Sequence, residues 1–392
     1  MNTAARSSGV SVLIPTFNRG EMLLEALESV LGQSVAPHQV VVIDDGSTDG
    51  TSERVMRYGD RVEYIRKDNG GKASALNLGL KRVTGDYVWV FDDDDVALAS
   101  SIADRLDVLE GKAESGLVLA RHFWGATSAS GAIEVRSESR WPPVDASNVI
   151  LTLMRGCFTM LQGALVRTDC YHTVGPFRED LLRSQDYDML LRLVRRYPVA
   201  FLDKPTYILR RHDGARGPVG ARHEAVDREQ VWARYDGLLG QHLRRDAALG
   251  EYLSPSTGDS LSTEQTRLAL LNRMSVMASK GLAAEMIEDA AAFVACGTDT
   301  APRRLAPAER AVATASVQHR YFLLTVVPRP AEFVSRARAL AGSPLGRDLL
   351  RAYARGLLGL AKWGAASMRE RVRIIRLAAG LAIFSYSARG SR

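Results

Sequence analysis

Four consecutive aspartates, Asp92 to Asp95, are the residues of this 392-residue sequence whose type and spacing most clearly permit chemistry. Adjacent carboxylates repel one another, and burying them without a counterion is costly, so they are either exposed to solvent or hold a cation. They follow an apolar run, 87–91, that is typical of a strand. Strand alternation would place Asp92 and Asp94 on one side and the other two aspartates on the opposite side. One pair could then share a metal ion.

A divalent cation is the ligand that such carboxylates favour. Mg²⁺ and Mn²⁺ are hard ions that take oxygen ligands, and the phosphates of a substrate commonly complete their coordination. The cation would neutralise the charge that develops on a diphosphate leaving group. The alternative is a solvated turn, because runs of like charge are usually exposed. The position of the run at the end of a strand favours the cation site.

A second acidic loop has the same position relative to a strand. The apolar run 40–43 leads into Asp44-Asp45-Gly46-Ser47-Thr48-Asp49-Gly50, which consists of turn-forming residues. The first 100 residues alternate between strand-like patterns at 10–15, 40–43, 62–66 and 87–91 and helix-like patterns after Asn18, at 51–58 and at 73–82.

This alternation predicts an α/β fold of the Rossmann-like kind, a mainly parallel sheet flanked by helices. Asn18 and Glu21 have the spacing of a capping box, which predicts that the first helix begins at Asn18. Further strands are expected at 116–123 and 163–166. Ligands of open α/β sheets bind beyond the carboxyl ends of the strands. The site is therefore expected where the two acidic loops converge.

The chain is longer than one hydrophobic core usually organises, which predicts two structural units. Beyond about residue 216 the pattern is helical, and Ser262 with Gln265 has the spacing of another capping box. We expect a catalytic domain over residues 1–218 and an α-helical domain over 219–392, with a basic tail from about 301.

Charge is distributed unevenly along the chain. Residues 301–392 contain 17 Lys and Arg against 4 Asp and Glu, a balance of +13, whereas the rest has 34 against 41, a balance of −7. Arg369, Arg373 and Arg376 recur at helical spacing beside apolar residues, which predicts a basic amphipathic helix. Such a helix can dock on its own domain, contact an anionic membrane or mediate self-association. Nucleic-acid binding is disfavoured because stacking aromatics are not interleaved with these arginines.

Several other classes of protein are disfavoured by the sequence. The three cysteines are scattered without metal-ligand spacing, which argues against a disulfide framework. The start of the chain lacks a secretory signal pattern, and no segment has the 18 uncharged apolar residues typical of a membrane span. We therefore expect a cytoplasmic protein, with peripheral contact at the inner face of the membrane as an open alternative.

Residues 10–214 resemble a family 2 glycosyltransferase with the GT-A fold. The resemblance rests on the order and spacing of several motifs, since each one alone is common. They are Ser11-Val12-Leu13-Ile14-Pro15-Thr16-Phe17-Asn18-Arg19, Val42-Ile43-Asp44-Asp45-Gly46-Ser47-Thr48-Asp49, Asn69-Gly70-Gly71-Lys72 with Ala75-Leu76-Asn77, Phe91-Asp92-Asp93-Asp94-Asp95, Val174-Gly175-Pro176-Phe177-Arg178-Glu179, Gln185-Asp186-Tyr187-Asp188 with Leu191-Arg192, and Arg210-Arg211-His212.

The resemblance implies a nucleotide pocket at the end of the first strand, with Asp44 accepting a hydrogen bond from the uracil ring. Lys72 would lie near the diphosphate or donor sugar, and its alternative is a solvated lysine at a helix start. The implied nucleotide and donor residues are Pro15, Thr16, Arg19, Asp44, Lys72, Asp92 and Asp93.

The resemblance also implies a metal site that holds Mn²⁺ or Mg²⁺. Asp94 is the expected direct ligand, with Asp92 or Asp93 nearer the donor sugar and ribose. His212 matches a histidine that can contact the metal or the diphosphate, although a lone histidine is more often structural.

Asp186 is the implied general base. Members of the family have an acidic pair before a helix, and here Gln185 replaces the first acid while Asp186 keeps the second. A single base opposite the leaving group implies direct displacement at the anomeric carbon and inversion of configuration. The alternative for Asp186 is a helix N-cap, where amide donors would reduce its basicity.

The sequence therefore predicts transfer of a sugar from a nucleoside diphosphate, with UDP as the expected nucleotide, to a hydroxyl of a glycan, a lipid-linked acceptor or a small molecule. Two other functions remain open. Gln185 makes a catalytically silent nucleotide-sugar-binding module conceivable. A nucleotidyltransferase would need a Gly-rich basic loop near the N-terminus, and residues 14–20 lack one.

Overall fold

The computed structural model describes residues 9–128, 131–211, 228–254, 260–296, 304–363 and 367–386. By its internal contacts the chain divides into two compact units. One comprises Met1–Val149 with Cys157–Glu229, and the other comprises Ile150–Gly156 with Gln230–Arg392. The boundary that the sequence suggests, between 218 and 219, lies outside the described residues.

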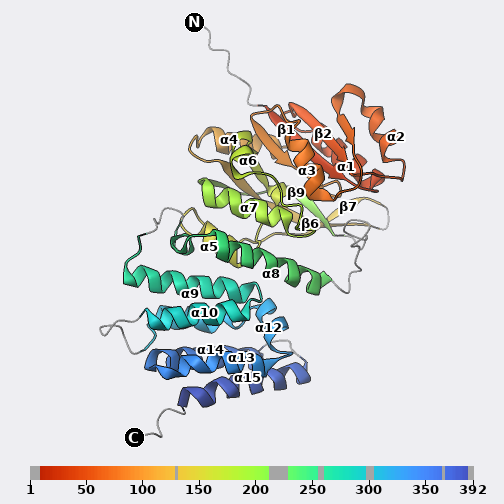
Figure 1. Ribbon diagram of the computed structural model, residues 1–392. Coiled ribbons are helices and arrows are strands. Elements are labelled where there is room, and N and C mark those ends of the chain that lie inside the picture. Colours follow the sequence, from red (N-terminus) through yellow and green to blue (C-terminus); the bar gives the residue numbers. More distant parts are fainter. Residues whose placement is uncertain are drawn as a thin grey trace. The chain divides into compact units, whose positions relative to one another are not determined.

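The first unit is built around one mixed, mainly parallel sheet (Figure 1). Its strand order is β3-β2-β1-β4-β8-β6-β9-β5, and β7 pairs with β6 outside this path. Neighbours from β3 to β4 run parallel, as do β6 and β9, whereas β8 is antiparallel to both of its neighbours. The strands are β1 Val10–Thr16, β2 Gln39–Asp44, β3 Glu63–Arg66, β4 Tyr87–Val90, β5 Val96–Ala97, β6 Leu117–Thr127, β7 Ile133–Glu138, β8 Ala164–Arg167 and β9 Val199–Arg211.

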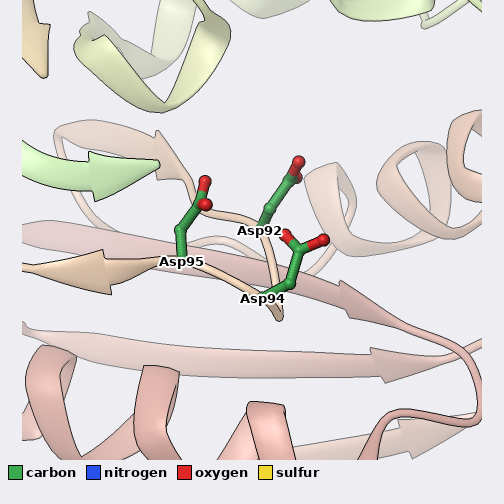
Figure 2. A group of neighbouring side chains, drawn as sticks. All are labelled: Asp92, Asp94 and Asp95. Carbon is green, nitrogen blue, oxygen red and sulfur yellow. The ribbon is translucent and has the colours of Figure 1, made fainter. Parts of the chain in front are cut away.

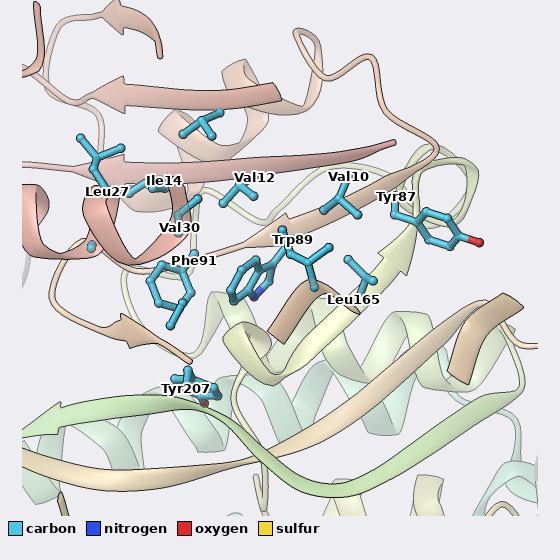
Figure 3. Close-up of a cluster of buried hydrophobic side chains, with 14 of the residues drawn as sticks. Val10, Val12, Ile14, Leu27, Val30, Tyr87, Trp89, Phe91, Leu165 and Tyr207 are labelled. Atoms are coloured by element: carbon cyan, nitrogen blue, oxygen red, sulfur yellow. The ribbon is translucent and has the colours of Figure 1, made fainter. Parts of the chain in front are cut away.

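Helices flank this sheet, which confirms the predicted α/β fold class. Its apolar core places Trp89 and Phe91 with their ring centroids 4.8 Å apart (Figure 3). Helix α3, Lys72–Leu80, lies so close to the sheet that Gly79 leaves no room for a side chain. A Cβ on Gly79 would lie 2.1 Å from Leu13 Cδ1. The helices of this unit are α1 Gly20–Leu31, α2 Thr51–Val55, η1 Met56–Arg61, α3 Lys72–Leu80, α4 Ser101–Glu110, η2 Leu161–Gly163, α6 Thr168–Val174 and α7 Gln185–Arg196.

The capping box predicted at Asn18 is wrong. Helix α1 begins at Gly20, and Asn18 has a positive φ of 52°. Its backbone N–H donates to Ser47 Oγ, and its Oδ1 accepts from Thr48 N at 2.7 Å. Asp49 Oδ2 instead accepts from Gly20 N at the helix start. Contacts with the loop after β2 thus replace the local cap that the spacing suggested.

The described part of the second unit contains helices and no strand, as the sequence pattern predicts. The capping box at Ser262 and Gln265 is confirmed at the start of α9. None of the described helices combines the length and apolar composition needed to cross a bilayer. The helices are α8 Arg228–Asp246, η5 Leu249–Tyr252, α9 Thr263–Ser279, α10 Ala283–Ala295, α11 Pro307–Ser316, α12 Arg320–Val326, α13 Pro330–Ala337, η6 Arg338–Gly342, α14 Pro344–Trp363 and α15 Met368–Tyr386, while α5 Val149–Arg155 spans the division between the units.

Candidate active site

The aspartate run lies on the loop that follows β4, at the carboxyl end of the parallel strands. One oxygen from each of Asp92, Asp94 and Asp95 lies within 4.8 Å of the others (Figure 2). The predicted alternation, with Asp95 on the side opposite Asp94, is therefore wrong. The strand ends at Val90, and a turn closed by Asp95 N and Asp92 O at 3.4 Å brings Asp95 round to the other two.

Asp93 connects this loop to the end of β1. Its carboxylate accepts from Thr16 Oγ1 at 2.7 Å and from Arg19 Nη1 at 2.8 Å, and the same Arg19 atom lies 2.9 Å from Asp94 Oδ2. The charges of Asp93 and then Asp94 raise the pKa of Arg19 despite its burial. The guanidinium thus offsets part of the negative charge of the run. Pro15, also predicted for the nucleotide pocket, is a buried residue of β1.

Lys72 joins two acidic residues that are distant in the sequence. It is the first residue of α3, and its Nζ lies 2.6 Å from Asp92 Oδ1 and 2.6 Å from Asp186 Oδ2. Burial opposes the charge of Lys72, but the Asp186 and Asp92 carboxylates outweigh it and raise the pKa of Lys72. The interpretation of Lys72 as a solvated helix-start lysine is therefore wrong.

Asp92 has an unusual acidity in this arrangement. Burial raises the pKa of Asp92 to about 6, Lys72 opposes the shift, and the charges of Asp186 and Asp94 add to it. An additional positive charge nearby would stabilise the ionised form of this carboxylate.

Asp186 lies in the first turn of α7 but does not cap it. The N-cap residue is Ser184, in a left-handed conformation with φ of 61°, so the interpretation of Asp186 as the N-cap is wrong. Asp186 Oδ2 is held by Lys72, whereas Asp186 Oδ1 is buried and has no hydrogen-bond partner among the described residues. An unsatisfied buried acceptor of this kind costs about 1–3 kcal/mol unless a ligand supplies the donor.

The loop after β2 carries Asp44 and Asp45 in different roles. Asp44 is fully buried, accepts from Ser47 N at 2.7 Å and also accepts from the Tyr64 hydroxyl. Burial, together with this bond, raises the pKa of Tyr64 to about 12. Asp45 accepts from four donors of the following loop, which are Lys67 Nζ, Asn69 Nδ2, Gly70 N and Gly71 N.

Asp45 therefore shapes the loop that leads into Lys72. Gly71 has φ of 90°, a conformation that favours glycine and lets its N–H point at this carboxylate at 2.7 Å. The sequence motifs do not predict these contacts of Asp45. The Asn69-Gly70-Gly71 triplet was the available signal, because it marks a tight loop rich in free backbone donors.

Arg210 on β9 is a site residue whose role the Arg210-Arg211-His212 motif does not predict. Its backbone N–H donates to Asp95 Oδ1 at 2.9 Å, and its Nε donates to the Asp94 carbonyl oxygen at 2.9 Å. Burial, with the Asp94 charge, raises the pKa of Asp95 well above its usual range. His212, the predicted second metal contact, lies outside the described residues.

The residues present fit a divalent cation. Three carboxylates offer oxygens within 4.8 Å of one another, and Asp95 Oδ2 is buried without a hydrogen-bond partner among the described residues. Oxygen-only donors of this kind suit Mg²⁺ or Mn²⁺ and leave room for phosphate oxygens.

Comparison with known proteins identifies the family of the segment that carries the aspartate run. Residues 11–144 match the sequence model of glycosyl transferase family 2. Residues 11–144 of the first unit belong to glycosyl transferase family 2. The resemblance stated from the motifs is thereby confirmed, and the motifs from 174 onward lie beyond the matched range.

Relatives of this family 2 domain include an uncharacterized glycosyltransferase of Rickettsia conorii, 29% identical over 231 residues, which are 58% of this chain and 38% of the relative. GlyG of Streptococcus pneumoniae is 30% identical over 118 residues, 29% of this chain and 39% of that protein. The chondroitin synthase of Pasteurella multocida is 28% identical over 187 residues, 47% of this chain and 18% of that enzyme. The chain thus spans well under two thirds of these three relatives.

The fold is also similar to that of residues 1–349 of TarS from S. aureus, solved in complex with UDP-GlcNAc. The TM-score is 0.52 at 19% identity, over 84% of this chain and 89% of that one. This likeness concerns the fold and agrees with a GT-A sheet followed by helices.

Proposed function

We propose that this chain is an inverting, metal-dependent glycosyltransferase. It would transfer a sugar from a nucleoside diphosphate, UDP in the first instance, to a hydroxyl of a glycan, a lipid-linked acceptor or a small molecule. The observation that carries the proposal is the bridge formed by Lys72 between Asp92 and Asp186, because it places a candidate base directly beside the carboxylate cluster. We assign this chemistry to residues 1–218, followed by the α-helical domain.

Asp94 is the proposed principal metal ligand, supported by its position in the cluster with Asp92 and Asp95. A bound Mn²⁺ or Mg²⁺ would neutralise the charge of the departing diphosphate. Lys72 would add further positive charge beside the departing diphosphate. His212 is proposed as a further contact of the metal or the diphosphate on the motif alone.

Asp186 is the proposed base. Lys72 holds its Oδ2, which leaves Oδ1 as the oxygen that can accept the proton of the attacking hydroxyl. A positioned carboxylate contributes through proton removal as the oxygen attacks. Attack from the side opposite the leaving group inverts the anomeric configuration, and no enzyme nucleophile takes part.

Pro15, Thr16, Arg19 and Asp44 are proposed to form the nucleotide side of the site. They lie at the ends of two adjacent parallel strands, β1 and β2, where ligands of such sheets bind. Asp93 would stabilise this region through Thr16 and Arg19. A UDP-linked donor is supported by the TarS structure, which contains UDP-GlcNAc.

The test combines binding with turnover. Calorimetry with UDP, with and without Mn²⁺, should show metal-dependent binding, and UDP release from a panel of nucleotide sugars should then identify donor and acceptor. The anomeric configuration of the product, read by NMR, decides inversion. Metal-dependent UDP binding without turnover on any acceptor would instead identify a silent binding module. Pyrophosphate release from a nucleoside triphosphate with a sugar phosphate would identify a nucleotidyltransferase.

A further inference from the structure

The terminal helix α15, Met368–Tyr386, has two apolar faces. One face is buried within its own unit and includes Ile374, Leu377 and Leu381. The helix is therefore anchored on the unit, beside α14 (Figure 1). The second face is a stripe of exposed apolar residues, defined as Met368, Val372, Ile375, Ala379, Ile383 and Tyr386.

This apolar stripe is continuous along the helix. Its members recur at intervals of three and four residues, so they occupy a sector about 80° wide at roughly 100° per residue. Ile383 and Met368 are 64% and 74% exposed. Single exposed apolar residues are ordinary, but a contiguous stripe marks an interaction surface.

Arginines border the stripe on both sides. At roughly 100° per residue, Arg376 and Arg369 lie about 20° and 40° beyond one edge of the sector, and Arg371 lies about 40° beyond the other. Arg373 lies on the same flank as Arg376 and Arg369 but further round the helix, about 80° from the edge. The single acid of the helix, Glu370, falls on neither edge but towards the buried side. An exposed apolar stripe with basic borders is typical of helices that lie in a membrane interface.

Two partners could cover this apolar stripe, a second copy of α15 or a lipid surface, and the charge of the helix distinguishes between them. A second copy of α15 would bring two sets of four arginines together, with Glu370 the only acid of each helix to offset them. The segment 301–392 carries a balance of +13, which adds to this repulsion. An anionic lipid surface is complementary to both the apolar stripe and its arginines. We propose that α15 docks this chain on the surface of an anionic membrane.

This inference is independent of the proposed function. The stripe belongs to the second unit, whereas the aspartate cluster belongs to the first. Lipid binding can therefore be measured without nucleotide, metal or turnover, and failure of one proposal leaves the other intact.

The test is flotation of the full chain with vesicles. Vesicles of phosphatidylcholine with about 30% phosphatidylglycerol should carry the protein, and neutral phosphatidylcholine vesicles should not. Binding should fall when salt is raised from about 0.1 M to about 0.5 M. The double variant Arg373→Gln with Arg376→Gln should bind about 25-fold more weakly, at roughly fivefold per arginine. The double variant Ile375→Ser with Ile383→Ser should also lose binding, by about tenfold or more.

Matched control variants on the same unit test whether vesicle binding depends on the α15 residues themselves or on the total charge and exposed apolar surface of the chain. Arg245→Gln with Arg336→Gln removes the same charge elsewhere, and Leu268→Ser with Leu324→Ser removes exposed apolar residues of α9 and α12. Both controls should bind like the unchanged chain, and circular dichroism should show that all variants fold.

Two results would overturn the proposal. The first is equal loss of binding in the controls and the α15 variants, which would show that total charge alone acts. The second is absence of vesicle binding together with a dimer, seen by analytical ultracentrifugation, that Ile375→Ser with Ile383→Ser dissociates. That result would assign the stripe to a second copy.

Discussion

Lys72 Nζ lies 2.6 Å from Asp186 Oδ2 and so ties the first residue of α3 to the first turn of α7, 114 positions further along the chain. The same ammonium lies 2.6 Å from Asp92 Oδ1. One cation thus separates two carboxylates that would otherwise repel each other. The position of the proposed base consequently depends on a residue of another helix.

Replacing Lys72 should impair transfer more than folding. In Lys72→Met the two carboxylates lose their shared counterion, and we expect kcat to fall about 100-fold as Asp186 moves from its position. Lys72→Arg should retain part of the activity because it keeps the charge. Steady-state UDP release measures both variants. Equal kcat in Lys72→Met and the unchanged chain would contradict a positioning role.

Asp186→Asn should keep donor binding and lose transfer. The amide oxygen can still accept from Lys72, but the side chain cannot take a proton, so kcat should fall at least about 100-fold. Calorimetry with UDP and Mn²⁺ should give an unchanged Kd. Asp188→Asn is the matched control on the same helix, since Asp188 pairs with Arg192 and should affect thermal stability instead. Retained transfer in Asp186→Asn would exclude the base assignment.

Asp94→Ala should abolish the metal dependence of UDP binding. The change removes one of the three clustered carboxylates and leaves the Arg19 guanidinium on Asp93. UDP titrations with and without Mn²⁺ should then coincide. Asp107→Ala, an exposed carboxylate of α4, serves as the control and should keep the difference between the two titrations. A full Mn²⁺ effect in Asp94→Ala would assign the metal to other ligands.

Asp45→Ala should destabilise the first unit. The change leaves four donors of the 67–71 loop without their acceptor, and we expect a loss of about 2–4 kcal/mol in the free energy of unfolding. Chemical denaturation measures it. Asp68→Ala, exposed on the same loop, should change stability by less than about 0.5 kcal/mol. Similar effects of the two substitutions would argue against Asp45 as the organiser of the loop.

His122 should make stability depend on pH between about 6.5 and 4. Burial, with the charge of Arg211, lowers the pKa of His122 from 6.5 to about 4, so the unfolded chain binds a proton in this range and the folded chain does not. Stability is therefore complete above pH 6.5 and falls as the pH drops towards 4, by about 2–3 kcal/mol. Both ring nitrogens lack hydrogen-bond partners among the described residues, so His122→Phe can preserve the packing.

Denaturation curves at several pH values should show a smaller acid loss in His122→Phe than in the unchanged chain. His172→Gln, at an exposed position of α6, is the matched control for replacing a histidine that is not buried. An unchanged profile in His122→Phe would show that other groups cause the acid loss.

The sequence by itself determined the elements and the family. Strands β1 to β4 follow from short β-rich runs, and the acidic loops follow from turn-forming residues placed directly after them. Both signals are local, since the side-chain period of a strand and the chemistry of a turn depend on adjacent residues alone. The order of the motifs then sufficed for the resemblance to family 2 glycosyltransferases.

Only the tertiary structure decided which partners the site residues have. Asn18 bonds to Thr48 instead of capping its own helix. Asp95 lies beside Asp92 because the strand ends at Val90. Lys72 contacts Asp186, 114 positions further along the chain. Each of these pairings is long-range or depends on where a strand stops. Polar groups bind the partners that the packed chain brings within reach, because an unpaired polar group that is withdrawn from water is costly. Periodicity cannot show that choice, whereas the folded sheet fixes it.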